Sequence, residues 1–139
     1  MSDLITDAEW EVMRVVWTLK ETSSTKIVKV LSNKMDWSSS TIKTLIRRLV
    51  KKDALQISSK GRTYLYKATI SEQSAMNNAL FDLFSHLCHK KSGKALLNLI
   101  QRIDLSKQDI ISLQKILDDK LKVAPEELAC NCLSNCCGD

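Results

Sequence analysis

Apolar residues recur every three or four positions along the first third of the chain, which is the spacing of amphipathic helices. A capping box at 6–9, Thr-Asp-Ala-Glu, predicts a first helix that runs to about Leu19. Ser23 or Ser24 caps a short second helix, and the serines at 38–40 offer N-caps for a third helix that ends near Lys52. The residues expected to face inward are Trp10, Met13, Val16, Trp17, Ile27, Val28, Leu31, Ile42, Leu45, Ile46 and Leu49.

Two β-favouring runs follow within 55–68, separated by Lys60-Gly61-Arg62. Glycine supplies the positive φ of a tight hairpin turn. Three helices followed by a hairpin with a basic tip form the winged helix-turn-helix pattern, in which the third helix enters the DNA major groove. The predicted fold class is therefore mainly α with a small β-hairpin wing, and we assign residues 1–70 to an N-terminal winged helix DNA-binding domain.

Wide apolar stripes mark the second half. Ser71 caps a long helix in which apolar residues step by four, three and four positions. Ser92-Gly93 interrupts the pattern, and Ser106 caps a last helix. Three helices of this size are too few to bury such stripes alone, so 71–123 is predicted to be a helical dimerisation domain of a homodimer. Packing of these stripes against the N-terminal half is the alternative.

The net charge of +5 hides a local imbalance, because residues 26–67 carry eleven Lys and Arg against two Asp, a local +9. Such a block suits a polyanion, since each cation placed on a phosphate releases condensed counterions. The polar side of the third helix carries hydroxyls near its start and cations further along, with no acid before Asp53. Candidate contacts to base edges and adjacent phosphates of double-stranded operator DNA are Ser39, Ser40, Thr41, Lys43, Thr44 and Arg47. Candidate contacts to phosphates are Arg48, Lys51, Lys60 and Arg62.

Several classes of protein are excluded by the sequence pattern. No stretch approaches the roughly 18–20 apolar residues of a membrane span. The N-terminus lacks the basic-then-apolar order of a signal peptide, so we expect a cytoplasmic protein without a membrane partner. Gly-rich phosphate loops, a Gly-x-Ser-x-Gly elbow and a His-Glu-x-x-His motif are all missing, so we expect no enzyme.

Four of the five cysteines lie within the last ten residues, in a tail at 124–139. In a reducing compartment a dense thiol cluster indicates metal ligation, and four thiolates suit Zn(II) or Cu(I). A disulfide or a redox switch is the alternative. The fifth cysteine, Cys88, stands between His86 and His89; it is predicted to be a small buried hydrophobe, and both histidines are predicted not to be ligands. The candidate metal ligands are Cys130, Cys132, Cys136 and Cys137.

Three segments together resemble the BlaI/MecI/CopY repressor family over residues 4–122. They are Asp7-Ala-Glu-Trp-Glu-Val-Met13, Trp37-Ser-x-x-Thr41-Ile-Lys-Thr44-Leu-Ile-x-Arg48-Leu-Val-Lys-Lys52 and Gly61-Arg-Thr-Tyr-Leu-Tyr66. The Cys-rich tail resembles the CopY branch of copper-responsive repressors. The resemblance implies a homodimer on a TACA–TGTA inverted repeat, bound to DNA with Zn(II) in the tail and released by Cu(I). A metallochaperone that donates copper is a further expected partner.

The tail departs from the usual CopY pattern, Cys-x-Cys-x4-Cys-x-Cys, because it reads Cys-x-Cys-x3-Cys-Cys. Asp139 stands where the last family cysteine would be, so either Cys136 replaces that ligand or the site is weaker and partly open. Penicillinase repressors of the same family are cleaved at an Asn-Phe bond, and this chain has no Asn-Phe dipeptide. Two alternatives stay open: a repressor of the same fold whose thiols sense oxidants, and a copper-buffering protein that does not bind DNA.

Overall fold

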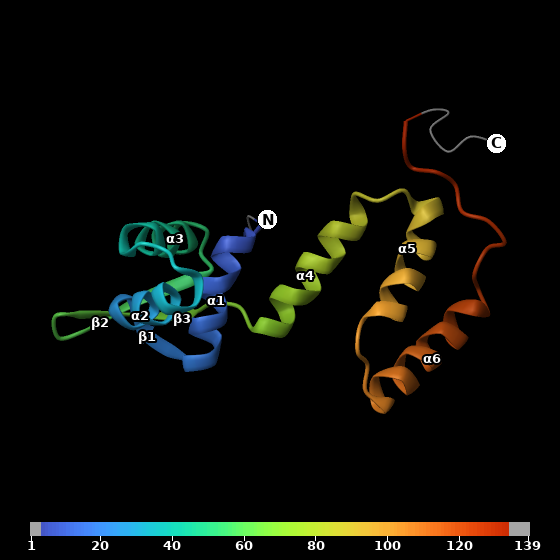
Figure 1. Ribbon diagram of the computed structural model, residues 1–139. Helices are drawn as coiled ribbons and strands as arrows, with labels where there is room; N and C mark the ends of the chain where they lie inside the picture. The colour runs from blue at the N-terminus through green and yellow to red at the C-terminus, as the bar shows by residue number, and fades with distance from the viewer. Residues whose placement is uncertain (1–3, 134–139) are drawn as a thin grey trace. The chain divides into compact units, whose positions relative to one another are not determined.

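The structure is a computed structural model that describes residues 4–133 (Figure 1). The chain forms two compact units, which divide between Phe81 and Asp82, inside the fourth helix. Within the described residues, none of the helices combines the length and the apolar character needed to cross a membrane. The elements are α1 (Asp7–Leu19), β1 (Glu21–Ser23), α2 (Ser24–Met35), α3 (Ser39–Lys51), β2 (Leu55–Lys60), β3 (Thr63–Ala68), α4 (Glu72–Ser85), α5 (His89–Arg102) and α6 (Lys107–Leu121).

The helices of the first unit begin where the sequence supplies capping side chains. The Thr6 hydroxyl accepts a hydrogen bond from the Glu9 N–H at 3.2 Å, and the Glu9 carboxylate accepts one from the Thr6 N–H at 3.1 Å, which confirms the capping box. The Ser23 hydroxyl caps α2 by accepting from the Lys26 N–H, and the Ser38 hydroxyl caps α3 by accepting from the Thr41 N–H, each without a reciprocal bond. These local hydrogen bonds fix the start of each helix, and α1 ends at Leu19 as predicted.

A single hydrophobic core lies between α1, α2, α3 and the sheet (Figure 1). Nine of the eleven residues predicted to face inward are buried, and Trp10 and Val28 are partly buried against them. The Trp17 indole packs edge-on against Trp10, with ring centroids 5.4 Å apart, and its Nε1 donates to the Ile70 carbonyl at 2.9 Å. Ala75 of α4 also belongs to this core. The start of α4 is therefore anchored in the first unit.

The predicted hairpin is confirmed, and a further strand joins it. β2 pairs with β3 in antiparallel register from Leu55↔Ala68 to Lys60↔Thr63, and Gly61 adopts the positive φ of 65° that the turn requires. The three residues of β1 pair with the other edge of β3, which gives the sheet order β1-β3-β2. β1 was not predicted, because three residues are too few to show an alternating pattern in the sequence.

The second unit differs from the predicted helix boundaries. The break expected at Ser92-Gly93 is wrong, because both residues lie inside α5, and the chain leaves the helical conformation at 86–88 instead. A Cβ on Gly93 would meet nothing within 4 Å, so this position is open, and glycine in an exposed helix costs only about 1 kcal/mol. The predicted cap of α4 at Ser71 and the capping box of α6 at Ser106 are both confirmed.

The helices of the second unit leave their apolar side chains exposed. α5 and α6 form an open V in Figure 1, and neither helix has a buried residue. Leu97 is 64% exposed and Leu121 is 76% exposed, whereas Leu31 and Leu49 of the first unit are fully buried. The apolar stripes that the sequence predicts are thus present on α5 and α6, and these two helices do not bury them against each other.

Candidate nucleic-acid interface and cysteine cluster

The first turn of α3 presents a group of hydroxyls to solvent. The Ser38 Oγ accepts from the Thr41 N–H at 3.2 Å and lies 3.2 Å from the Ser40 Oγ and 2.9 Å from the Thr41 Oγ1. Ser39, Ser40 and Thr41 are exposed. Together with the positive end of the helix dipole, these hydroxyls form a surface that favours anions and polar base edges.

One turn further along α3, the hydroxyl of Thr44 orients the guanidinium of Arg47. The Thr44 Oγ1 donates to the Ser40 carbonyl at 2.9 Å and accepts from the Arg47 Nη2 at 3.3 Å. The guanidinium of Arg47 is therefore held along the exposed side of the helix rather than extended freely. Since a preorganised guanidinium loses less conformational entropy on binding, this pair is suited to the recognition of a base or a phosphate.

The predicted cations gather on α3 and at the tip of the hairpin, and all of them are exposed. Among the described residues, none of these cations forms an ion pair. The opposite side of α3 is buried in the core, so the cationic side faces solvent by necessity. The cations concerned are Lys43, Arg47, Arg48 and Lys51 of α3 and Lys60 and Arg62 beside Gly61.

A hollow of about 300 Å³ lies between α2, α3 and β3. It is bordered by Lys43 and Arg47 of α3 and by Ser24 at the start of α2, with Ile46 and Tyr66 as its apolar lining. Two cations beside a helix N-terminus are the usual surroundings of a bound phosphate in proteins. This hollow therefore extends the cationic side of α3 toward α2.

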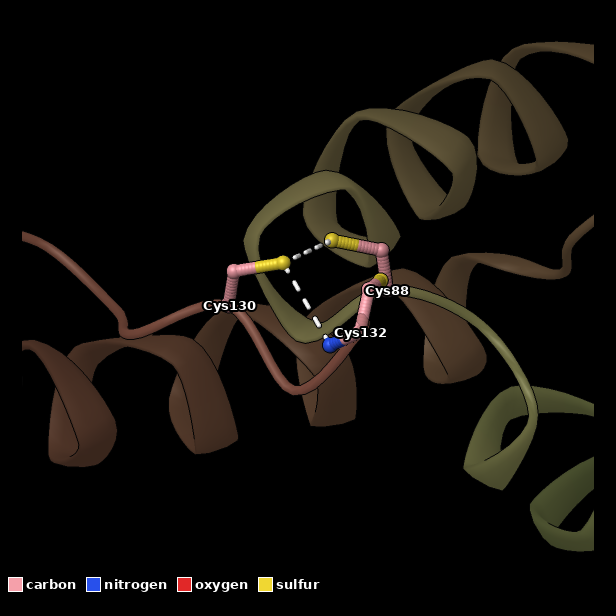
Figure 2. Close-up of side chains that lie close together, drawn as sticks. All are labelled: Cys88, Cys130 and Cys132. Atoms are coloured by element: carbon pink, nitrogen blue, oxygen red, sulfur yellow. Dashed lines mark hydrogen bonds between the residues drawn. The ribbon is translucent and has the colours of Figure 1, made fainter. Parts of the chain in front are cut away.

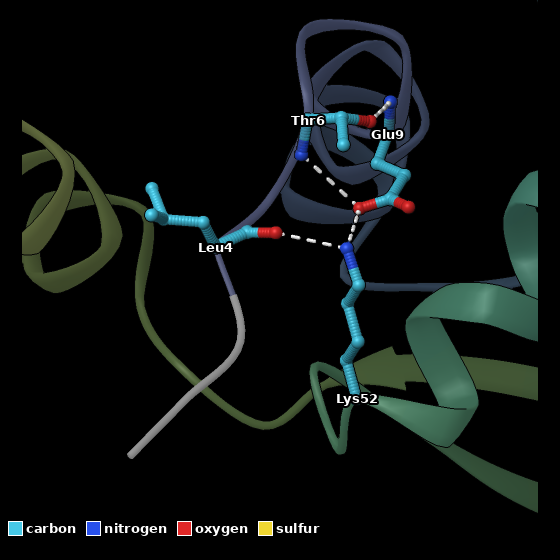
Figure 3. A network of polar contacts seen from close by, with 4 residues as sticks. All are labelled: Leu4, Thr6, Glu9 and Lys52. Carbon is cyan, nitrogen blue, oxygen red and sulfur yellow. Dashed lines mark hydrogen bonds and ion pairs between the residues drawn. The ribbon is translucent and has the colours of Figure 1, made fainter.

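Lys52 has a different role from its neighbours, as Figure 3 shows. Its Nζ lies 2.7 Å from the Glu9 Oε2 and 2.8 Å from the Leu4 carbonyl, and Glu9 is only 1% exposed. This ion pair ties the end of α3 to the start of α1. The sequence pattern places Lys52 in the basic block and Glu9 in a capping box, because nothing local links two residues so far apart in the chain. Lys52 is thus paired within the protein and holds the exposed helix in place.

Three cysteines meet in the second unit, as Figure 2 shows. The Sγ atoms of Cys88, Cys130 and Cys132 all lie within 4.8 Å of one another, close enough to bind one metal ion. The Cys88 and Cys130 sulfurs are 3.6 Å apart, and the Cys132 N–H donates to the Cys130 Sγ at 3.4 Å. Of the four predicted ligands, the structure brings Cys130 and Cys132 together, whereas Cys136 and Cys137 lie outside the described residues.

Cys88 corrects a prediction. It is half-buried rather than buried, and it lies at the N-cap of α5, where its sulfur faces the tail. The prediction was wrong because it placed Cys88 on the face of a continuous helix, while the helix ends before this residue. The neighbouring His89 N–H donates to the Asn131 Oδ1 at 2.7 Å, so a tail residue caps α5. The only sequence signal for this arrangement was the Cys-Asn-Cys spacing, which does not reveal its partner.

Comparison with known proteins identifies a family and its relatives. The model of the penicillinase repressor family matches residues 5–119. An uncharacterized 16.5 kDa protein from the ptsI 3′ region of Latilactobacillus sakei is 50% identical over 133 residues, which cover 96% of this chain and 91% of the relative. The penicillinase repressor of Bacillus licheniformis is 31% identical, with 83% and 90% covered. A solution structure of monomeric Bacillus licheniformis BlaI in complex with the blaP half-operator is 38% identical, covers 52% of this chain and 89% of that chain, and gives a TM-score of 0.48.

Proposed function

Because this chain belongs to the penicillinase repressor family, we propose that it is a transcriptional repressor that binds double-stranded operator DNA as a homodimer. The observation that carries the proposal is the exposed side of α3, which has hydroxyls at its start, cations beyond them and no acidic residue. A surface of like charge repels itself unless a polyanion covers it. Because the apolar side of α3 is buried in the core, its cationic side must face solvent.

The contacts divide by position along the helix and the hairpin. A helix placed in the major groove reads base edges with its N-terminal residues, and the flanking cations lie on the backbone. The hollow bordered by Ser24, Lys43 and Arg47 accepts one backbone phosphate. The residues assigned to bases and adjacent phosphates are Ser39, Ser40, Thr41, Lys43, Thr44 and Arg47. The residues assigned to phosphates alone are Arg48, Lys51, Lys60 and Arg62.

A second copy of the chain is the proposed cover for the apolar side chains of 71–123. Leu97, Ile111 and Leu121 are more than half exposed in one chain. A homodimer would place two copies of α3 about 34 Å apart, one helical turn of DNA, on an inverted repeat of the TACA–TGTA type. This part of the proposal predicts that a half-site DNA binds far more weakly than the full palindrome, and equal affinity for both would refute the dimer.

The tail is the proposed sensor, with Zn(II) in the DNA-bound form and Cu(I) as the signal for release. The residues that would hold the metal are Cys130 and Cys132, joined by Cys136 and Cys137 from the part of the tail outside the described residues. Thiolates are the ligands that Zn(II) and Cu(I) share, although Zn(II) favours a closed tetrahedron. Release by Cu(I) requires that it bind the DNA-free conformation better than the DNA-bound one. A metallochaperone would supply the copper.

The deciding experiment is anaerobic fluorescence anisotropy on the inverted repeat, with Zn(II) and then Cu(I) added. We expect tight binding with Zn(II) and dissociation on addition of Cu(I). A Cys130→Ser/Cys132→Ser variant should bind the operator and ignore copper. Unchanged copper sensitivity in that variant would contradict the metal response, and absence of specific binding by the wild type would contradict the repressor itself.

A redox-sensing repressor is the second candidate, since the 3.6 Å between the Cys88 and Cys130 sulfurs is a short step from a disulfide bond of about 2.05 Å. Two thiols would lose two electrons and two protons to form one disulfide, and one molecule of hydrogen peroxide would accept them and become two molecules of water. Operator release by peroxide in metal-free protein, together with no response to anaerobic Cu(I), would favour this candidate over metal sensing.

A further inference from the structure

We propose that Cys88 is a ligand of the same metal site as Cys130 and Cys132, so that the bound ion fastens the tail to the start of α5. This inference rests on the proposed metal response and changes its ligand set: Cys88, from outside the tail, takes one of the four positions of a tetrahedral ion, so that at most one further tail ligand joins Cys130 and Cys132. The ion would then be bonded directly to the segment that connects α4 and α5, because Cys88 lies in that segment.

The distances between the sulfurs fit ligands of a single ion. Two thiolates on one tetrahedral Zn(II), each about 2.3 Å from the metal, lie roughly 3.8 Å apart. The Cys88 and Cys130 sulfurs are 3.6 Å apart, and all three sulfurs lie within 4.8 Å of one another. A shift of about 1 Å brings the widest pair to the spacing of metal ligands. Three converging sulfurs exceed what a disulfide uses, and they come from segments 42 positions apart in the chain.

A hydrogen bond also holds the tail at the start of α5, independently of the sulfur distances. α5 has no capping side chain of its own, because Cys88 stands at the N-cap position without a cap hydrogen bond. The Asn131 Oδ1 accepts from the His89 N–H at 2.7 Å and supplies that cap from the tail. The Cys-Asn-Cys segment therefore contacts the start of α5 in two ways. The side chain of Asn131 caps the helix, and the sulfurs of Cys130 and Cys132 face Cys88 (Figure 2).

The chemistry of the cluster selects the class of metal. Within the described residues, the group contains three sulfurs and no carboxylate or imidazole. Sulfur ligands select thiophilic ions such as Cu(I) and Zn(II), whereas Mg(II) and Ca(II) require oxygen ligands. The positive end of the α5 dipole also favours the negative charge of a metal–thiolate group at this position. The site is therefore assigned to Cu(I) or Zn(II).

Cysteine alkylation of the full-length protein tests the assignment without any substitution. The reduced protein is loaded anaerobically with Zn(II) or Cu(I), pulsed with N-ethylmaleimide and analysed by peptide mass spectrometry. We expect Cys88, Cys130 and Cys132 all to react at least about tenfold more slowly with metal than without. If Cys88 reacts at the same rate in both conditions while the tail cysteines are protected, Cys88 is no ligand and the proposed metal response still stands. Protection of no cysteine by either metal would overturn both.

The Cys88→Ser variant measures what the third sulfur contributes. It removes the soft donor with little change in volume, and we expect the Cu(I) affinity, from anaerobic competition with bathocuproine disulfonate, to fall at least about tenfold. Ser92→Ala is the matched control, because the Ser92 hydroxyl donates to the His89 carbonyl in the same turn of α5 and carries no metal donor in the proposed site. The control should keep the wild-type affinity. Equal Cu(I) affinities for Cys88→Ser and the wild type, together with thiolate-to-Co(II) charge-transfer bands of equal intensity in the two Co(II)-loaded proteins, would overturn the proposal.

Discussion

The two units of this chain use the same kinds of apolar residue to opposite effect. In the first unit, α1, α2 and α3 cover their apolar sides with one another and with the sheet. In the second unit, α5 and α6 diverge, and leucines at helical spacing face solvent. An apolar stripe therefore predicts that one face of a helix packs against another surface. Only the tertiary structure shows whether that surface belongs to the same unit. The first unit buries its apolar side chains within itself, whereas α5 and α6 of the second unit have no buried residue.

Matched leucine-to-alanine substitutions give the largest expected contrast between the units. Leu31→Ala should lower the free energy of unfolding by about 3 kcal/mol, because it leaves a cavity in a packed core. Leu97→Ala, at a site 64% exposed, should change the unfolding of the first unit by less than about 0.5 kcal/mol. Urea unfolding followed by tryptophan fluorescence measures this, since Trp10, Trp17 and Trp37 all lie in the first unit. Equal losses would show that the two units share one core.

Adjacent lysines at the end of α3 sharpen the comparison within the first unit. Lys52→Met leaves the buried Glu9 carboxylate without its cation and should lower the free energy of unfolding by about 2 kcal/mol. This cost is smaller than that of breaking a fully buried ion pair, because the Lys52 side chain is 19% exposed. Lys51→Met should leave stability unchanged and weaken binding to every DNA sequence. Urea unfolding and anisotropy titrations on both variants test the division of roles. A Lys52→Met protein as stable as the wild type would contradict the structural role of the pair.

A smaller change in DNA binding should distinguish residues that contact bases from residues that contact phosphates. Thr44→Ala removes the hydroxyl that orients Arg47 and should reduce discrimination between operator and random DNA by about 1 kcal/mol. Lys60→Ala should weaken both DNAs alike and flatten the salt dependence by about one unit of slope. Anisotropy titrations at several salt concentrations provide the measurement. The groove assignment is wrong if both substitutions reduce specific and random binding equally.

The smallest expected effect concerns an ion pair near the surface, between Glu11 of α1 and Lys34 of α2. The Lys34 side chain hydrogen-bonds Glu11 at 2.7 Å and, with Arg14, holds the pKa of that carboxyl below its ordinary value. A lowered folded-state pKa means that this stabilisation is present above the unfolded-state pKa and is lost as the pH falls through the folded-state pKa. Lys34→Met should therefore cost about 0.5 kcal/mol at neutral pH and nothing once Glu11 is protonated. Urea midpoints measured in steps from neutral pH into the acid range test this, and a cost that stays constant down to the lowest pH at which the protein folds would contradict it.

Local signals made much of the first unit predictable. The capping residues Thr6, Ser23 and Ser38 fix helix starts within four positions, and Gly61 fixes the turn of the hairpin, so neighbouring residues carry the information. The apolar and charged sides of α3 could likewise be assigned from helical spacing alone.

The features that the sequence analysis missed all depend on partners far along the chain. β1 is defined by pairing with β3, and Lys52 by a carboxylate 43 positions earlier. The break before α5 was misplaced because its cap comes from Asn131, 42 positions later. Cys88 was misassigned for the same reason, since its environment is the tail and not its own helix. No pattern in a single sequence identifies such partners.

The short distance between Cys88 and Cys130 has a thermodynamic consequence for the helices that separate them. An ion that joined these two sulfurs would close a loop of 42 positions that contains all of α5 and α6. By analogy with a covalent cross-link, closing such a loop lowers the entropy of the unfolded chain by an amount worth up to about 4 kcal/mol. The metal would then stabilise a part of the chain whose helices bury no residue, and chelation should loosen α5 and α6 while the first unit keeps its fold.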